Sequence, residues 1–128
     1  MRRINAHAVL IVNAIFAGIA GAILILAPTS GLFEDIGLPI AEPEIYAQFA
    51  GGLLLVFAVL LWEAPTDPVL ERHIGRAAAA ANVIGGVVLA LWLLSGELDT
   101  TGSGATILWI ATVILAALAL LESRYLRP

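Results

Sequence analysis

Charged residues are missing from four long stretches of the sequence, and this pattern limits the possible folds more than any other feature. Residues 4–33, 45–62, 77–96 and 100–121 contain no Asp, Glu, Lys or Arg. The hydrocarbon core of a bilayer is about 30 Å thick, and a helix of roughly 20 residues crosses it. Each stretch is therefore long enough to be a transmembrane segment.

These segments are expected to be helices, because they lack the alternating polarity of a membrane-spanning strand. Apolar residues make up 61% of the chain, whereas a typical soluble domain is about half apolar. The sequence predicts an all-α bundle of four transmembrane helices that forms one integral membrane domain. We expect helices at residues 4–27, 44–62, 68–95 and 104–123, and a short interfacial segment at residues 30–37.

The first apolar stretch follows Met1, Arg2 and Arg3, as the core of a secretory signal would. Signal cores contain about 7–15 apolar residues, and this stretch is longer. We therefore expect a retained first helix. Pro28 is expected to end it, because proline disfavours continuation of a helix.

All the arginines fall on one side of the predicted membrane topology. They are Arg2, Arg3, Arg72, Arg76, Arg124 and Arg127. The two connections on the other side carry only acidic charges, namely Glu34, Asp35, Glu42, Glu44, Glu97 and Asp99. Basic residues gather in the cytoplasmic connections of membrane proteins. We therefore expect both termini, and the connection between the second and third helices, to be cytoplasmic.

The connection from Glu63 to Arg76 carries much of the charge of the chain. Asp67 is a favourable N-cap, and the following Pro68 suits the first position of a helix. The third helix is therefore expected to begin at Pro68, before the membrane. The charged residues of its first turns are expected to form a solvated ring at the membrane surface.

Three carboxamide side chains interrupt the apolar helices: Asn13, Gln48 and Asn82. At 1.5 Å per residue, Asn13 and Asn82 should lie about 9–14 Å from the cytoplasmic boundary, so they can meet at a similar depth. Helical spacing places Glu71 and Gly86 on the face of Asn82, and Gly52 on the face of Gln48. The second and third helices therefore each present a polar spot on one face.

Two interpretations of these amides remain open. In the first, they form hydrogen bonds between helices, each worth about 0.6–2 kcal/mol, while small residues let the helices approach closely. In the second, they orient an apolar or lipid-like molecule in a pocket between the helices. The predicted ligand-binding residues are then Asn13, Gln48, Gly52, Glu71, Asn82 and Gly86.

Several kinds of chemistry find no support in the sequence. It contains no cysteine, which excludes disulfides and thiolate sites. We find no nucleophile with a neighbouring base, no metal-ligand cluster and no phosphate-binding loop. His7 and His73 both lie near the cytoplasmic boundary, but two interfacial histidines alone do not define a haem site. We therefore expect no enzymatic activity, no metal and no cofactor.

An ion or proton path is also not favoured, because no acidic or basic residue lies in the middle of a predicted span. Glu63 and Glu122 end the second and fourth helices at the cytoplasmic boundary. Each is expected to pair with Arg76 or Arg124, in a purely structural role.

The first outer connection and the second helix resemble a known family. A proline-terminated first helix is followed by LFEDIGLP at residues 32–39 and by YAQFAGGLLLVFAVLLW at residues 46–62. This pattern resembles the DoxX-like group of small four-helix bacterial membrane proteins, mainly over residues 28–62. The resemblance implies a compact bundle in the bacterial inner membrane, in a family with some members linked to redox or quinone-associated complexes. It transfers no catalytic residue.

Three functions are compatible with these features. The first is a non-enzymatic inner-membrane protein that holds an apolar or lipid-like small molecule within the bundle. The second is a structural or accessory subunit that packs against copies of itself or against other membrane proteins. The third, which the sequence favours least, is a small oligomeric transporter. Membrane lipids are the expected partners in every case, and no nucleic-acid partner is expected.

Overall fold

The computed structural model describes residues 5–39 and 42–127, and this part of the chain is helical and contains no strand. Its long helices are α1 (Ala6–Ser30), α3 (Ile45–Glu63), α4 (Pro68–Ser95) and α5 (Gly104–Glu122). The shorter elements are α2 (Leu32–Ile36) and the 3-10 turns η1 (Ala64–Thr66) and η2 (Ser123–Leu126). Each of the four long helices is long enough and apolar enough to cross a membrane.

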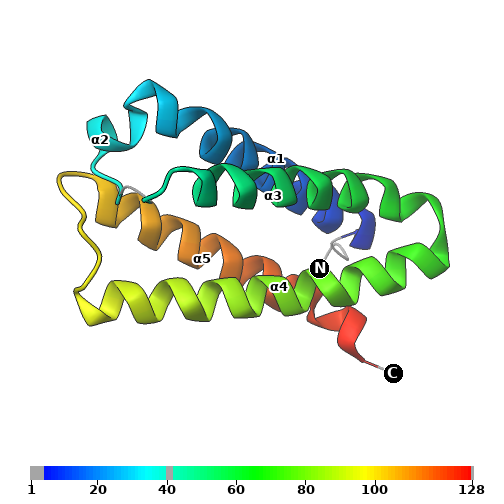
Figure 1. Cartoon of the computed structure of the whole chain (residues 1–128). Coiled ribbons are helices and arrows are strands. Elements are labelled where there is room, and N and C mark those ends of the chain that lie inside the picture. Colours follow the sequence, from blue (N-terminus) through cyan, green and yellow to red (C-terminus); the bar gives the residue numbers. More distant parts are fainter. Residues whose placement is uncertain (1–4, 40–41, 128) are drawn as a thin grey trace.

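The four long helices form two pairs, with α1 packed against α3 and α4 packed against α5 (Figure 1). We call one end of the bundle the arginine end, because Arg72, Arg76, Arg124 and Arg127 lie there. The connections at the other end, the acidic end, carry Glu34, Asp35, Glu42, Glu44, Glu97 and Asp99. The first turn of α1, the connection from α3 to α4 and the turn η2 all lie at the arginine end (Figure 1). Arg2 and Arg3 lie outside the described residues.

Glycines allow α1 and α3 to approach closely. A Cβ atom added to Gly51 would lie 2.6 Å from the carbonyl oxygen of Gly21, and one added to Gly21 would lie 2.8 Å from the carbonyl oxygen of Gly51. Neither position can therefore hold a side chain without separation of the two helices. Small residues at helix contacts are the usual means of close packing in membranes, where lipid tails are as apolar as the side chains.

The two helix pairs are joined at the acidic end by the connections between their helices. The backbone N–H of Thr101 donates to the carbonyl oxygen of Gly37 at 3.0 Å, and Ser103 Oγ donates to the carbonyl oxygen of Ile36 at 3.3 Å. Gly37 has a φ of 75°, which L-residues with side chains rarely adopt. The end of α2 is thus fixed against the start of α5.

The helix boundaries fall close to the predicted ones, but α1 continues through Pro28 to Ser30. The hydroxyl of Thr29 donates to the carbonyl of Leu26, and that of Ser30 donates to the carbonyl of Ala27, so the last turn is supported by side chains. Gly31 then takes a left-handed φ of 72° and ends the helix. The prediction that Pro28 ends this helix was wrong, because Gly31 supplies the stop.

The two halves of the chain are built alike. In each half a long helix is followed by a connection at the acidic end and then by a helix of 19 residues that ends in a glutamate, either Glu63 or Glu122. A 3-10 turn follows each of these glutamates. The glutamates differ in one respect, since Glu63 is exposed whereas Glu122 is buried.

Candidate functional site

Glu122 lies inside the bundle and binds an asparagine from each helix pair. Asn13 Nδ2, on α1, donates to Glu122 Oε1 at 2.7 Å, and Asn82 Nδ2, on α4, donates to Glu122 Oε2 at 2.7 Å. The exposed fractions are 1% for Asn13, 5% for Asn82 and 0% for Glu122. We call these three residues the polar triad. It is the point where α1, α4 and α5 are joined by side chains.

Helical periodicity explains how the triad is formed. Asn13 lies on the buried face of α1 beside Leu10, Ala14 and Ala17. Asn82 belongs to a buried face of α4 that also contains Gly75, Ala78, Ala79 and Gly86. Glu122 is the last residue of α5 and follows the buried positions Thr112, Leu118 and Ala119. The glycines and alanines among these neighbours bring the three helix axes close enough for the polar side chains to meet.

The carboxylate of Glu122 has partners for both of its oxygens. A buried carboxylate is costly unless it is hydrogen-bonded or paired with a charge. The two amide N–H groups supply the hydrogen bonds, and the guanidinium of Arg124 acts on the carboxylate electrostatically. Among the described residues, no buried side-chain nitrogen or oxygen atom lacks a hydrogen-bond partner. The triad is therefore a satisfied polar site in an apolar interior.

The turn η2 folds back against α4 on the arginine-end side of the triad. Tyr125 Oη donates to Glu71 Oε1 at 2.8 Å, and Arg76 Nε donates to the carbonyl oxygen of Tyr125 at 2.9 Å. The ring of Tyr125 packs at Gly75, where an added Cβ would lie 2.5 Å from the nearest ring carbon. His7 Nε2, on α1, lies 3.8 Å from Glu71 Oε2. We call His7, Glu71, Arg76 and Tyr125 the second polar layer.

The structure brings together two of the three predicted amides. Asn13 and Asn82 meet through Glu122, as their expected depths allow. Gln48 instead lies toward the acidic end, where its Nε2 donates to the carbonyl oxygen of Ile25 at 3.5 Å. Ile25 is twelve residues beyond Asn13 on α1, or about 18 Å at 1.5 Å per residue. Gln48 is therefore separate from the triad.

The other predicted ligand-binding residues have different surroundings. Glu71 belongs to the second polar layer. Gly86 is buried and faces Leu115 of α5. A Cβ added to Gly52 would meet no atom within 4 Å, because the buried positions of α3 are Ala47, Gly51 and Leu61. The expectation that Gly52 faces the interior together with Gln48 is corrected here, since Gly51 is the glycine that faces α1.

Glu122 is the residue whose role the sequence did not reveal. It was expected at the membrane surface, paired with Arg76 or Arg124. It is instead buried, and its hydrogen-bond partners are Asn13 and Asn82, while the guanidinium of Arg124 acts on it electrostatically. Arg76 binds the carbonyl of Tyr125 instead. The bundle interior therefore does contain an ionisable side chain, at the end of α5 and not in the middle of a span. Helical spacing places it on the same face of α5 as Thr112 and Ala119, but the sequence alone does not show that this face is buried.

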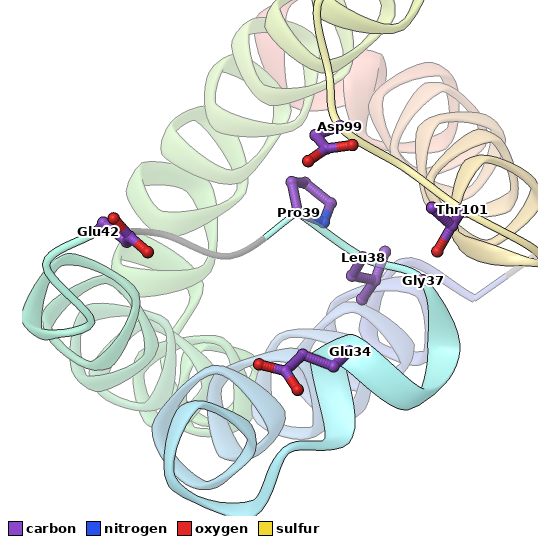
Figure 2. Close-up of a pocket in the computed structure, with 7 residues that line it drawn as sticks. All are labelled: Glu34, Gly37, Leu38, Pro39, Glu42, Asp99 and Thr101. Atoms are coloured by element: carbon purple, nitrogen blue, oxygen red, sulfur yellow. The ribbon is translucent and has the colours of Figure 1, made fainter.

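An open pocket of about 380 Å³ lies at the acidic end. Figure 2 shows the carboxylates of Glu34, Glu42 and Asp99 around it, each from a different segment of the chain. Gly37, Leu38, Pro39 and Thr101 complete its lining. Within residues 5–39 and 42–127, no group of three or more His, Cys, Asp or Glu residues is arranged to hold a metal ion. These carboxylates therefore form an acidic rim and not a chelating site.

The chain matches no protein-family model, no curated protein and no solved structure. The similarity to the DoxX-like group accordingly stays a prediction from residues 28–62.

Proposed function

We propose that this protein is a small, non-enzymatic membrane protein that serves as a structural or accessory subunit. In this role, its apolar outer faces pack against copies of itself or against other membrane proteins. The main observation in support is that the polar side chains of the interior bind one another, while large apolar side chains point outward. Asn13 and Asn82 are held by Glu122, so their N–H groups are engaged within the protomer.

The outward apolar side chains support this proposal. Phe49 on α3 is 68% exposed, Leu94 on α4 is 73% exposed, and Leu120 on α5 is 75% exposed. Exposed apolar faces of this extent are typical of surfaces that contact lipid or another protein. The four helices that carry them are long enough and apolar enough to cross a membrane.

The charge distribution supports a bacterial inner-membrane location with both termini in the cytoplasm. The described arginines gather at one end of the bundle, and the connections at the other end carry acids only. The positive-inside rule then assigns the arginine end to the cytoplasm. A reporter enzyme fused after Pro128 tests this orientation. Activity of a cytoplasmic reporter is expected, and activity of a periplasmic reporter would overturn the orientation.

Native mass spectrometry of the protein released from a mild detergent tests the subunit role. It reports the oligomeric state and any bound small molecule in one spectrum. The proposal predicts a homo-oligomer or a complex with another membrane protein. A protomer that stays alone in every mild detergent tried, and that brings no partner from the native membrane, would contradict it.

A second candidate function is the binding of an apolar or lipid-like small molecule. It is favoured by an apolar groove of about 270 Å³ that is lined by Gly85, Val88, Leu89, Trp92 and Leu98. The variant Val88→Trp would fill this groove and should remove a co-purified lipid from the native mass spectrum. Val87→Trp is the matched control, because Val87 is exposed on the same helix and does not line the groove. Retention of the lipid in Val88→Trp would exclude the groove as its site.

A further inference from the structure

Glu122 occupies a position where an uncharged side chain would suffice for packing. Amide and hydroxyl groups alone can join membrane helices by hydrogen bonds. The polar triad instead contains a carboxylate that is 0% exposed and is held between two helix pairs. Ionisable residues inside membrane bundles are costly, and they commonly mark sites that bind protons or ions. The subunit role proposed above does not require an ionisable group at this point.

The triad can satisfy its hydrogen bonds with or without a proton on Glu122. In the ionised form, both carboxylate oxygens accept from amide N–H groups, as the structure shows. A protonated carboxyl group needs one acceptor for its O–H group. Each asparagine can provide this acceptor, because rotation of the amide exchanges its N–H donors for its carbonyl oxygen. The two asparagines therefore suit a group that gains and loses a proton.

Tyr125 stands between the triad and the arginine end along the buried face of α4. Glu71, Gly75 and Asn82 share this face, with Gly75 one turn after Glu71 and Asn82 two turns after Gly75. Tyr125 Oη binds Glu71, the ring of Tyr125 packs at Gly75, and Glu122 binds Asn82. The ring also packs against the apolar cluster that contains Leu10 and Ala78. The ring of Tyr125 thus packs against α4 at Gly75, on the arginine-end side of Asn82.

Polar groups continue from Tyr125 to the exposed surface. Glu71 Oε1 accepts from Tyr125 Oη at 2.8 Å, and Glu71 Oε2 lies 3.8 Å from Nε2 of His7, whose side chain is 52% exposed. The titratable and charged groups that face this region are His7 from α1, Glu71 and Arg76 from α4, and Arg124 from η2. These groups lie at the arginine end, the side from which a proton would reach Glu122.

We propose that Glu122 is a proton-binding site, and that η2, held in place by Tyr125, controls access to this site from the arginine end. In the structure, the ring of Tyr125 packs at Gly75 and against the cluster that contains Leu10 and Ala78, and this arrangement is the closed state of the proposal. When η2 moves away from Gly75, the carboxylate is reached from the surface that carries His7 and Glu71.

Reaction with dicyclohexylcarbodiimide, an apolar reagent for protonated carboxyl groups, tests both parts of the proposal. The carboxyl proton passes to one nitrogen of the reagent, and a carboxyl oxygen bonds to its central carbon. An acyl shift to nitrogen then leaves a stable adduct, and no group departs. The mass of one reagent molecule is thereby added to the peptide that contains Glu122. Purified protein in detergent is treated at a series of pH values and mapped by mass spectrometry.

In the wild-type protein we expect slow labelling of Glu122 that becomes faster as the pH falls. Tyr125→Ala removes both the ring and its hydrogen bond, so labelling of Glu122 should accelerate at least about tenfold. This factor corresponds to a fall of about 1.4 kcal/mol in the free energy needed to open the site. Tyr125→Phe keeps the ring on Gly75, so its labelling rate should lie between those of the wild type and Tyr125→Ala. Equal rates in all three proteins would overturn control by η2. Absence of labelling at every pH in all three would overturn the proton-binding site.

Titration with SDS in mixed micelles shows whether Tyr125→Ala is still folded, because Glu63 is already exposed and its labelling would not respond to unfolding. If Tyr125→Ala is unfolded, Tyr125→Phe alone decides the access question, with a faster rate than wild type expected and an unchanged rate contradicting it. Infrared difference spectra recorded between high and low pH test the site without any change in η2. A carbonyl band of a protonated carboxyl group should be present in wild type and Glu63→Gln and lost in Glu122→Gln. An identical spectrum in Glu122→Gln would overturn the assignment of the proton to Glu122.

Discussion

The Nδ2 atom of Asn13 donates a 2.7 Å hydrogen bond to Oε1 of Glu122, and this contact joins the first helix of the bundle to the last. Asn82 binds the other oxygen of the same carboxylate. Because α1 packs with α3 and α4 packs with α5, Glu122 links the two helix pairs near the arginine end. At the acidic end, the backbone contact between Thr101 and Gly37 provides the corresponding link.

Replacement of Glu122 by alanine should destabilise the bundle strongly. The change leaves the amide groups of Asn13 and Asn82 buried without their acceptor, and each unsatisfied group costs about 1–3 kcal/mol. The free energy of unfolding, measured by titration with SDS in mixed micelles, should fall accordingly.

Glu63→Ala is the matched control for this experiment. Glu63 also ends a helix of 19 residues, but its side chain is exposed. Its replacement should change the free energy of unfolding by no more than about 0.5 kcal/mol. A similar loss in both variants would show that the polar triad contributes nothing specific.

Two adjacent glycines on α3 should respond in opposite ways to alanine. In Gly51→Ala, the new Cβ would lie 2.6 Å from the carbonyl oxygen of Gly21, so α1 and α3 must separate. Such overpacking typically costs about 1–3 kcal/mol. In Gly52→Ala the Cβ meets no atom within 4 Å, and the helix gains about 0.5–1 kcal/mol from the lower conformational freedom of alanine. Unfolding titrations of the two variants should therefore differ in sign, and equal effects would refute the α1–α3 contact.

Gly31 and Gly37 provide a second matched pair, at the acidic end. Both have a left-handed backbone, with φ values of 72° and 75°, so alanine should cost about 1–2 kcal/mol at either position. Only at Gly37 would the new Cβ overlap the backbone of Thr101, whereas at Gly31 it would meet nothing within 4 Å. Gly37→Ala should thus also expose the amide of Thr101 to hydrogen exchange. Protection of that amide in Gly37→Ala would contradict the link between the two connections.

Asp67→Ala should loosen the start of α4 without affecting the rest of the bundle. Asp67 Oδ1 accepts from the backbone N–H groups of Val69 at 2.7 Å and Leu70 at 3.0 Å. Loss of an N-cap of this kind costs about 0.5–2 kcal/mol. Hydrogen exchange should accelerate at Val69 and Leu70 and stay unchanged at Asn82. Unchanged exchange at Val69 would show that the cap is dispensable.

Much of the fold follows from the distribution of charge along the sequence. The charge-free stretches locate all four long helices, and Asp67-Pro68 predicts the start of α4 at the residue where it begins. The end of α1 was less predictable, because the hydroxyls of Thr29 and Ser30 support a turn that Pro28 alone would disfavour. Local sequence rules do not register such compensation by neighbouring side chains.

The candidate site was predictable only in part. Asn13 and Asn82 were predicted to meet because they lie at a similar depth in the membrane. The structure joins them through Glu122. Glu122 itself was missed because it stands beside Arg124 at the end of an apolar stretch, where glutamates usually face water. Its burial depends on how η2 and α4 cover the end of α5. Such coverage is a property of tertiary packing and is not encoded in one stretch of sequence.

The most direct test of the polar triad is a double-mutant cycle between Asn13 and Glu122. Unfolding free energies are measured in mixed micelles for the wild type, Asn13→Ala, Glu122→Ala and the double variant. Residues in direct contact typically show a coupling energy of about 0.5–3 kcal/mol, and we expect a value in this range. A coupling energy indistinguishable from that of the control pair Asn13 and Glu63 would contradict the contact that holds the two helix pairs together.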